Sequence, residues 1–230
     1  MFGLQTVLWD IFTGTVEYKK WGWNLVAVSV IGTIVLTFVV ARALWTQHKK
    51  ILLQRSGDGL SVTWFAYFAA VLVALIFYGI YQKSAAIIFN GVVLGAFHAL
   101  IVIDLFRFGT WTANEKTQVF TFIFLPVIMI ISPWEEGTFL VLSFGMVYSV
   151  GTQVWKMWNS EEVGVLDPWV VASQLASVGF WGIYAFLADL PALMILNPLL
   201  FVLFGSMLVL WFLYKEKEKD NFFAEPENAE

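Results

Sequence analysis

Four residues that could bind a neutral solute lie inside long apolar stretches of the chain. Asn90 and Asn197 each stand about five residues into such a stretch, where an amide offers donors and an acceptor to hydroxyl groups. Ser177 and Trp181 are four residues apart, which places them on one face of a helix. Asparagine inside a membrane also holds helices together by hydrogen bonds, so the residue types alone leave binding and packing roles open.

Groups that could support catalysis, metal binding or ion coupling are scarce. The chain has no cysteine, which excludes thiolate metal sites, and it shows no Ser-His-Asp grouping, metal-ligand spacing or phosphate-binding loop. Asp104 is expected to pair with Arg107, and His98 to pack as a hydrogen-bonded residue. Glu135 and Glu136 fall in an expected loop and should be solvated. We therefore expect no enzyme, no metal or other cofactor, and no nucleic-acid partner.

A short motif occurs twice in the sequence, and the residues that follow it recur at nearly the same spacing. Thr46-Gln47 recurs as Thr152-Gln153, an offset of 106, and glycine and asparagine landmarks recur at offsets of 105 to 107. An internal repeat of a membrane unit is typical of transporters that bind their solute between the two copies. The repeat therefore favours a transport function.

Matching positions of the two copies supply further candidates for the site. An offset of 106 pairs Thr37 with Ser143, and Met146 follows one turn later. These candidates are weaker, because Ser and Thr often bond their own helix backbone. An offset of 107 places Ala74 opposite Trp181, so the site is expected to have one aromatic wall and one small wall.

Composition and charge spacing place these residues in membrane helices. Hydrophobic residues make up 60% of the chain, charged residues only 13%, and the mean hydropathy is +0.77. A soluble domain of this size would be far less apolar. Spans of about 20 residues cross a bilayer as helices. The seven predicted spans are 24–45, 60–81, 85–107, 117–134, 138–155, 168–187 and 190–214.

The predicted fold is therefore an all-α membrane protein in which two three-helix bundles of the same orientation are joined by a linker helix, a 3+1+3 arrangement. The first segment is expected to be amphipathic and to lie at the membrane interface. The predicted parts are an N-terminal segment 1–23, a first bundle 24–107, a linker 108–137, a second bundle 138–214 and a charged tail 215–230.

Lysine and arginine set the expected orientation. Ten of these residues fall on one side of the predicted membrane and three, Lys19, Lys20 and Lys83, fall on the other. The positive-inside rule then places the C-terminus in the cytoplasm and the N-terminus outside.

The residues after each repeated motif carry a resemblance to a known family. Gln47 is followed by basic residues and by Gly59-Leu60-Ser61, and the second copy keeps Gln153, Lys156 and Gly164. This order resembles the PQ-loop superfamily, and within it the SWEET and SemiSWEET sugar transporters. Thr46 and Thr152 stand where the family has its namesake proline.

The resemblance implies a sugar pocket made by Asn90, Asn197, Trp181 and Ser177, in which the indole stacks on a sugar ring while the amides bind hydroxyls. It implies facilitative transport of a neutral mono- or disaccharide by alternating access, in a multi-pass protein of the plasma membrane. Other branches leave open a proton-coupled amino-acid or vitamin carrier, or a cargo receptor that transports nothing. The expected partners are the solute and the lipid bilayer, and a homo-oligomer stays open.

Overall fold

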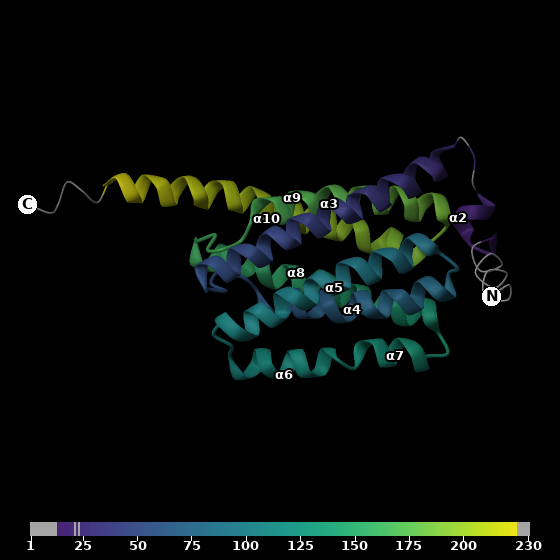
Figure 1. Cartoon of the computed structure of the whole chain (residues 1–230), viewed down its shortest axis with the longest axis horizontal. Coiled ribbons are helices and arrows are strands. Elements are labelled where there is room, and N and C mark those ends of the chain that lie inside the picture. The colour runs from purple at the N-terminus through teal and green to yellow at the C-terminus, as the bar shows by residue number, and fades with distance from the viewer. Residues whose placement is uncertain (1–12, 21, 23, 225–230) are drawn as a thin grey trace, which may run out of the picture.

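The protein is described by a computed structural model that covers residues 13–20, 22 and 24–224, with side chains up to residue 217. Within these residues all regular secondary structure is helical, and there is no strand. The helices run nearly parallel along one long direction (Figure 1). They are α2 (Val16–Lys19), α3 (Leu25–Gln54), α4 (Val62–Tyr81), α5 (Ala85–Phe108), α6 (Ala113–Phe122), α7 (Leu125–Ile131), α8 (Glu135–Ser160), α9 (Pro168–Ala188) and α10 (Pro191–Ala224).

Seven segments are long and apolar enough to cross a membrane, counting α6 and α7 together as the span Ala113–Ile131. The prediction of an all-helical, multi-pass membrane protein with seven spans is confirmed. The amphipathic segment predicted at the N-terminus falls mostly on residues 1–12, which lie outside the described residues.

Short polar side chains fix where the helices begin. The side chains of Asn24, Ser61 and Ser84 each accept a hydrogen bond from a backbone N–H in the first turn of α3, α4 and α5. Such caps satisfy donors that have no partner within the helix. Thr112 and Glu115 form a reciprocal capping box at the start of α6.

Several of the predicted spans are shorter than the helices observed. α8 runs from Glu135 to Ser160 instead of over 138–155, and α10 continues to Ala224 instead of ending at residue 214. The first span was expected to end at residue 45, but α3 continues to Gln54, so Thr46 and Gln47 are helical residues. The linker was expected to be one helix over 117–134, but it is split into α6 and α7. Pro126 lies in the first turn of α7 and has no N–H to donate to Phe122, which is where α6 ends.

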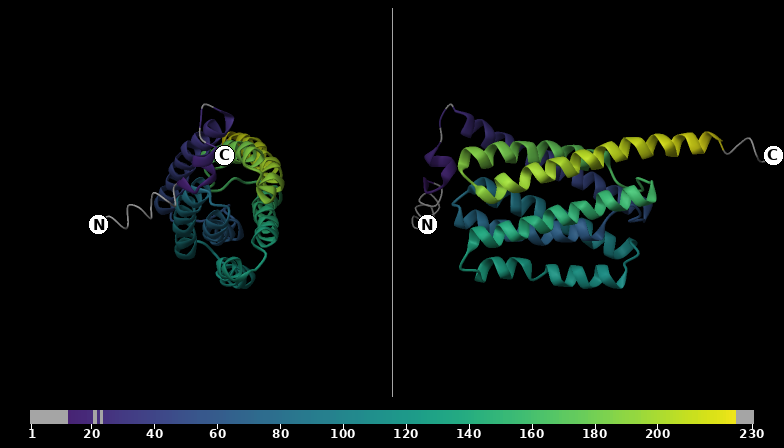
Figure 2. Two further views of the ribbon diagram at one scale, coloured as in Figure 1. Left: turned by 90° about the vertical axis from the view of Figure 1, so that its right-hand side faces the viewer. Right: turned by 180° about the vertical axis from the view of Figure 1, so that it is seen from behind.

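Helix packing follows one scheme twice. α5 packs against α3 and α4, and α10 packs in the same way against α8 and α9. Between these two groups, α3 lies against α9 and α4 against α8. Figure 2 shows the linker helices α6 and α7 at one edge of the molecule, where they pack on α4. The space enclosed between the two groups holds the candidate site.

Candidate solute site

A cavity lies between the two groups of helices. The space that the centre of a water-sized sphere can occupy in it is about 60 Å³, so the helices leave a narrow cavity. The wall comes from α4, α5, α8, α9 and α10, is mostly apolar, and contains no Asp, Glu, Lys or Arg among the described residues. Its polar and aromatic residues are Asn90, His98, Gln174, Ser177, Trp181, Asn197, Phe68 and Phe139.

Five of the residues predicted for the site line this cavity: Asn90, Asn197, Ser177, Trp181 and Met146. They come from four helices, so the fold brings together side chains that lie far apart in the sequence.

The other three candidates lie outside the described wall. Thr37 stands directly behind it, since its hydroxyl lies 3.0 Å from Asn90 Oδ1 as well as 2.8 Å from the carbonyl of Thr33. Ser143 donates to its own helix at Phe139 O and faces a separate shallow pocket. Ala74 is fully buried but is not part of the cavity wall.

The wall also fixes the register of the two copies. On α4 it is formed by Phe68, Val71, Leu72 and Leu75, and on α9 by Gln174, Ser177, Val178 and Trp181, which follow them one by one at an offset of 106. The residue equivalent to Trp181 is therefore Leu75. The expected offset of 107 in this helix was wrong by one residue, and the wall opposite Trp181 is aliphatic instead of small.

Asn90 and Asn197 reach the cavity without being equivalent positions. The buried faces of α5 and α10 match at an offset of 106, which pairs Asn90 with Leu196 and Asn197 with Gly91. Asn197 donates its side-chain amide to Leu193 O at 2.8 Å. The two amides therefore enter the cavity from different angles, because one residue is about 100° around a helix.

His98 and Gln174 line the cavity, although the sequence analysis did not place them in the site. His98 is fully buried, its ring stacks on Phe68 at a centroid distance of 5.4 Å, and its Nδ1 lies 2.8 Å from Leu94 O. His98 therefore packs and forms a hydrogen bond as expected, but it also lines the cavity. Both residues share a helix face with predicted residues: His98 is two turns from Asn90, and Gln174 is one turn from Ser177.

Asp104 does not form the ion pair with Arg107 that its spacing suggests. Its carboxylate lies 2.5 Å from His48 Nδ1 of α3, and its side chain is almost completely buried. Neither residue belongs to the cavity wall. Among the described residues no group of three His, Cys, Asp or Glu side chains could hold a metal ion.

At one end of the helices two glutamines form hydrogen bonds between the helix groups, and we call it the glutamine end. Gln47 of α3 donates to Val165 O at 3.0 Å and accepts from Asp167 N at 2.7 Å. Gln153 of α8 donates to Gly59 O at 2.7 Å and accepts from Ser61 N at 2.6 Å. The two sets of partners are related by the same offset as the glutamines themselves.

Lysines and glycines complete the glutamine end. Lys50 donates to Leu166 O, and Lys156, the equivalent residue of the second copy, donates to Leu60 O. Gly59 and Gly164 both have positive φ, and a Cβ on Gly59 would lie 2.8 Å from the Cα of Gly164. The two loops therefore touch backbone to backbone, which only glycine permits.

At the opposite end two carboxylates form hydrogen bonds between the helix groups, and we call it the glutamate end. Glu136 of α8 accepts hydrogen bonds from Tyr78 Oη, Gln82 Nε2 and Ala192 N. The expectation that Glu136 is solvated in a loop was wrong, because α8 begins at Glu135 and directs Glu136 toward α4 and α10.

Glu17 of α2 plays the same part for the other group of helices. Its carboxylate accepts from Ala85 N and Ala86 N at the start of α5, and from the hydroxyls of Ser84 and Tyr184. Each glutamate thus joins the first turn of one helix to a tyrosine of the other group, and Tyr78 and Tyr184 are themselves equivalent positions of the two copies.

Comparison with known proteins agrees with this architecture. The structure is similar to that of a eukaryotic SWEET transporter, with a TM-score of 0.57 over 83% of this chain and 97% of that chain, at 12% sequence identity. No protein-family model and no curated protein matches the chain. The likeness shows a shared fold, as the motif order predicted.

Proposed function

We propose that the chain is a transporter that carries a neutral sugar, a mono- or disaccharide, across a membrane down its gradient. The observation that carries the proposal is a cavity that has an indole, three amides, an imidazole and a hydroxyl in its wall and, among the described residues, no Asp, Glu, Lys or Arg. An indole face suits the apolar face of a sugar ring, and amides suit its hydroxyls.

The charge of the wall separates this function from its alternatives. A carrier of amino acids, or a receptor for a charged peptide or lipid, has to neutralise the charge of its ligand inside the membrane, where an unpaired charge is costly. The described wall offers no such group, and Asp104 is already paired with His48 outside it.

The hydrogen bonds between the helix groups at both ends suit alternating access. On α4 the wall residues lie between Ser61 at the glutamine end and Tyr78 at the glutamate end, and on α9 between Asp167 and Tyr184. Opening either end requires one set of hydrogen bonds between the helix groups to break while the other holds. We infer that the two ends open in turn around a fixed central site.

The test is uptake of labelled glucose and labelled sucrose by liposomes that contain the purified protein. Protein-free liposomes and a zero-gradient measurement serve as controls. We expect uptake that equilibrates without accumulation and that an uncoupler hardly changes. Concentrative uptake driven by an imposed pH gradient would show proton coupling. Uptake of both sugars at the protein-free rate would refute sugar transport.

A further inference from the structure

Most of the buried polar atoms that lack a hydrogen-bond partner among the described residues belong to the cavity wall. Among the described residues four buried side-chain nitrogens have no partner, and three of them, His98 Nε2, Gln174 Nε2 and Trp181 Nε1, belong to residues of the cavity wall. The fourth is Trp64 Nε1. Burying a polar group without a partner costs roughly 1–3 kcal/mol, so such groups are rare unless a ligand or water satisfies them.

The hydrogen bond of His98 defines what its free nitrogen can do. Nδ1 lies 2.8 Å from the carbonyl oxygen of Leu94, and a carbonyl can only accept, so Nδ1 carries the proton. In the neutral imidazole Nε2 is then an acceptor. The ring cannot turn easily to another partner, because it is stacked on Phe68 and lies 5.9 Å from the ring of Phe65.

Gln174 offers the complementary function. Its unpartnered atom is the amide nitrogen, which has two N–H groups to donate, and its side chain is almost completely buried. An acceptor on α5 and a donor on α9 therefore line one cavity. A hydroxyl group, which both donates and accepts, satisfies this pair, whereas a carboxylate cannot donate to His98 and an ammonium cannot accept from Gln174.

Packing alone does not call for polar residues at these two positions. At the offset of 106, the residue equivalent to Gln174 is Phe68 and the residue equivalent to His98 is Phe204. Phe68 and Phe204 are both buried and pack against each other and against Trp64. In each case the equivalent position of the other copy is thus filled by an aromatic ring.

The pair lies on the glutamine-end side of the indole and the asparagine amides proposed above to hold the sugar. His98 lies eight residues from Asn90 along α5, and Gln174 lies seven residues from Trp181 along α9, both toward the glutamine end. At about 1.5 Å per residue, His98 is roughly 12 Å from Asn90 along the helix axis and Gln174 is roughly 10 Å from Trp181, while Ser177 lies one turn from Gln174 and connects the pair to the predicted site.

We propose that His98 and Gln174 form a second subsite, on the glutamine-end side of Trp181, that binds one hydroxyl group of the solute between the Nε2 acceptor and the amide N–H. This proposal rests on the proposed sugar transport. It adds a specificity determinant that selects solutes with a hydroxyl at one position.

The test pairs variants of the protein with analogues of the sugar. Monodeoxy analogues of glucose and sucrose compete with the labelled parent sugar in liposome uptake, for wild type, His98→Leu, Gln174→Leu and the conservative His98→Gln. We expect that removal of one particular hydroxyl weakens inhibition of wild-type uptake roughly 5- to 100-fold. The same removal should hardly change inhibition of uptake by the two leucine variants. His98→Gln should recover much of the discrimination, because its amide oxygen can accept in place of Nε2.

If each deoxy analogue loses inhibition by the same factor in the wild type and in both leucine variants, the proposed subsite is rejected. If no sugar competes, the proposed transport function has failed, and a second measurement then tests the subsite by itself. Thermal unfolding of the unliganded protein should show His98→Phe and Gln174→Leu at least as stable as wild type, because they remove unpaired polar atoms. Gln153→Leu, which breaks two hydrogen bonds, is the control that should lose stability. A loss of similar size in the subsite variants would show a structural role and reject the proposal.

Discussion

Trp181 and Asn197 offer the most direct test at the scale of single residues. Trp181→Ala and Asn197→Ala should each weaken sugar binding several-fold to roughly a hundredfold, because a stacked aromatic and a buried hydrogen bond contribute about 1 kcal/mol or more each. Expression and thermal stability of the unliganded protein should stay nearly unchanged. Competition against labelled sugar in liposome uptake measures the effect.

The control is Trp158→Ala, which makes the same change on α8 at a side chain that is 60% exposed. It should leave uptake unaltered. If the Trp181 and Asn197 variants misfold while the surviving protein binds sugar normally, the two residues pack the helices and the binding site lies elsewhere.

Gly59 tests the contact between the two loops. Gly59→Ala should lower the free energy of unfolding by about 1 kcal/mol or more, because positive φ disfavours a side chain and the new Cβ would meet backbone of the other loop. Gly151→Ala on α8 is the matched control, since a Cβ there meets nothing within 4 Å. It should be neutral or stabilising in a helix. Equal melting temperatures for both variants in detergent would contradict this account.

Residue types and helical spacing predicted five residues of the cavity wall, but they could not fix its register. Asn90 and Asn197 suggested an offset of 107, whereas the buried faces obey 106. Two asparagines one position out of register can still reach one cavity, because helices from both groups surround it. His98 was read as a packing residue because the sequence cannot show that one ring nitrogen lacks a partner.

At the scale of the helices, the two ends should respond in opposite ways. The chain has no cysteine, so Ser177→Cys places a single thiol in the cavity wall. In this Ser177→Cys background, Glu136→Ala removes three hydrogen bonds at the glutamate end, and Gln153→Ala removes two at the glutamine end. Each change should favour the state in which its own end is open.

A membrane-impermeant thiol reagent, applied to one side of sealed vesicles at a time, measures these states. Glu136→Ala should speed labelling from the side of the glutamate end, and Gln153→Ala from the other. Glu135→Ala and Gln54→Ala change similar side chains that lie outside these bonds and are the controls. Faster labelling from the same side in both variants would reject opening in turn.

The existence and order of the helices could be predicted because the thickness of the bilayer sets the length of each apolar run, and charged residues separate the runs. Their ends were harder to predict. The polar residues after Trp45 continue α3 beyond the apolar run, and Pro126 divides the linker within an apolar stretch. Glu136 illustrates a third difficulty: its partners Tyr78, Gln82 and Ala192 lie far from it along the chain, so its role depends on tertiary packing.

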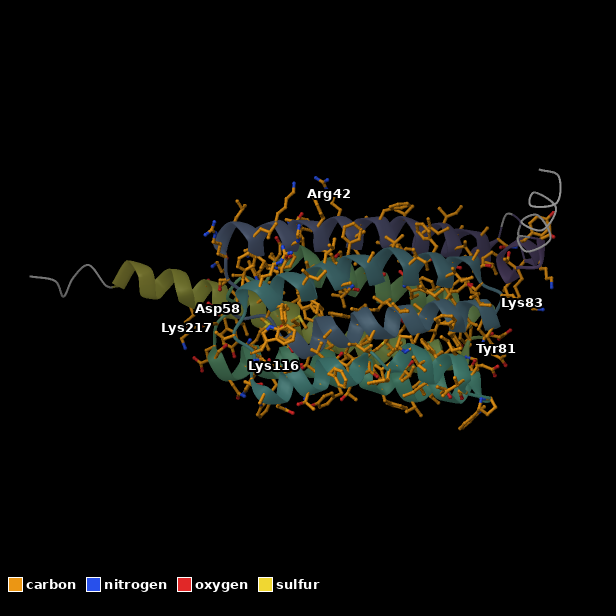
Figure 3. The ribbon with its side chains drawn as sticks, turned by 60° about the horizontal axis from the view of Figure 1, so that its bottom comes forward. Arg42, Asp58, Tyr81, Lys83, Lys116 and Lys217 are labelled. Carbon is orange, nitrogen blue, oxygen red and sulfur yellow. The ribbon has the colours of Figure 1, made fainter. Side chains whose placement is uncertain are left out.

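The orientation of the whole molecule rests on the distribution of its basic residues. Lys116 and Lys217 lie at one end of the helices together with Asp58, and Lys83 lies at the opposite end (Figure 3). The positive-inside rule predicts that the glutamine end faces the cytoplasm. A tag after Glu230 should therefore be inaccessible to antibody on intact cells, and a tag before Phe2 accessible. Detergent-permeabilised cells control for tag exposure, and the reverse pattern would invert the orientation.

The reciprocal bonds of Gln47 and Gln153 have the form of an isologous interface, in which a contact from one subunit to another is returned by the same residues in the opposite direction. Two identical chains related by a twofold axis would have to place the same side chain on both sides of the cavity. Two copies within a single polypeptide can differ in sequence. Here Phe68 and Phe204 lie on one side of the cavity, and their equivalents Gln174 and His98 lie on the other. At this level the enclosed space is consequently polar on one side only, so a solute bound there as proposed would lose these contacts if it turned end for end.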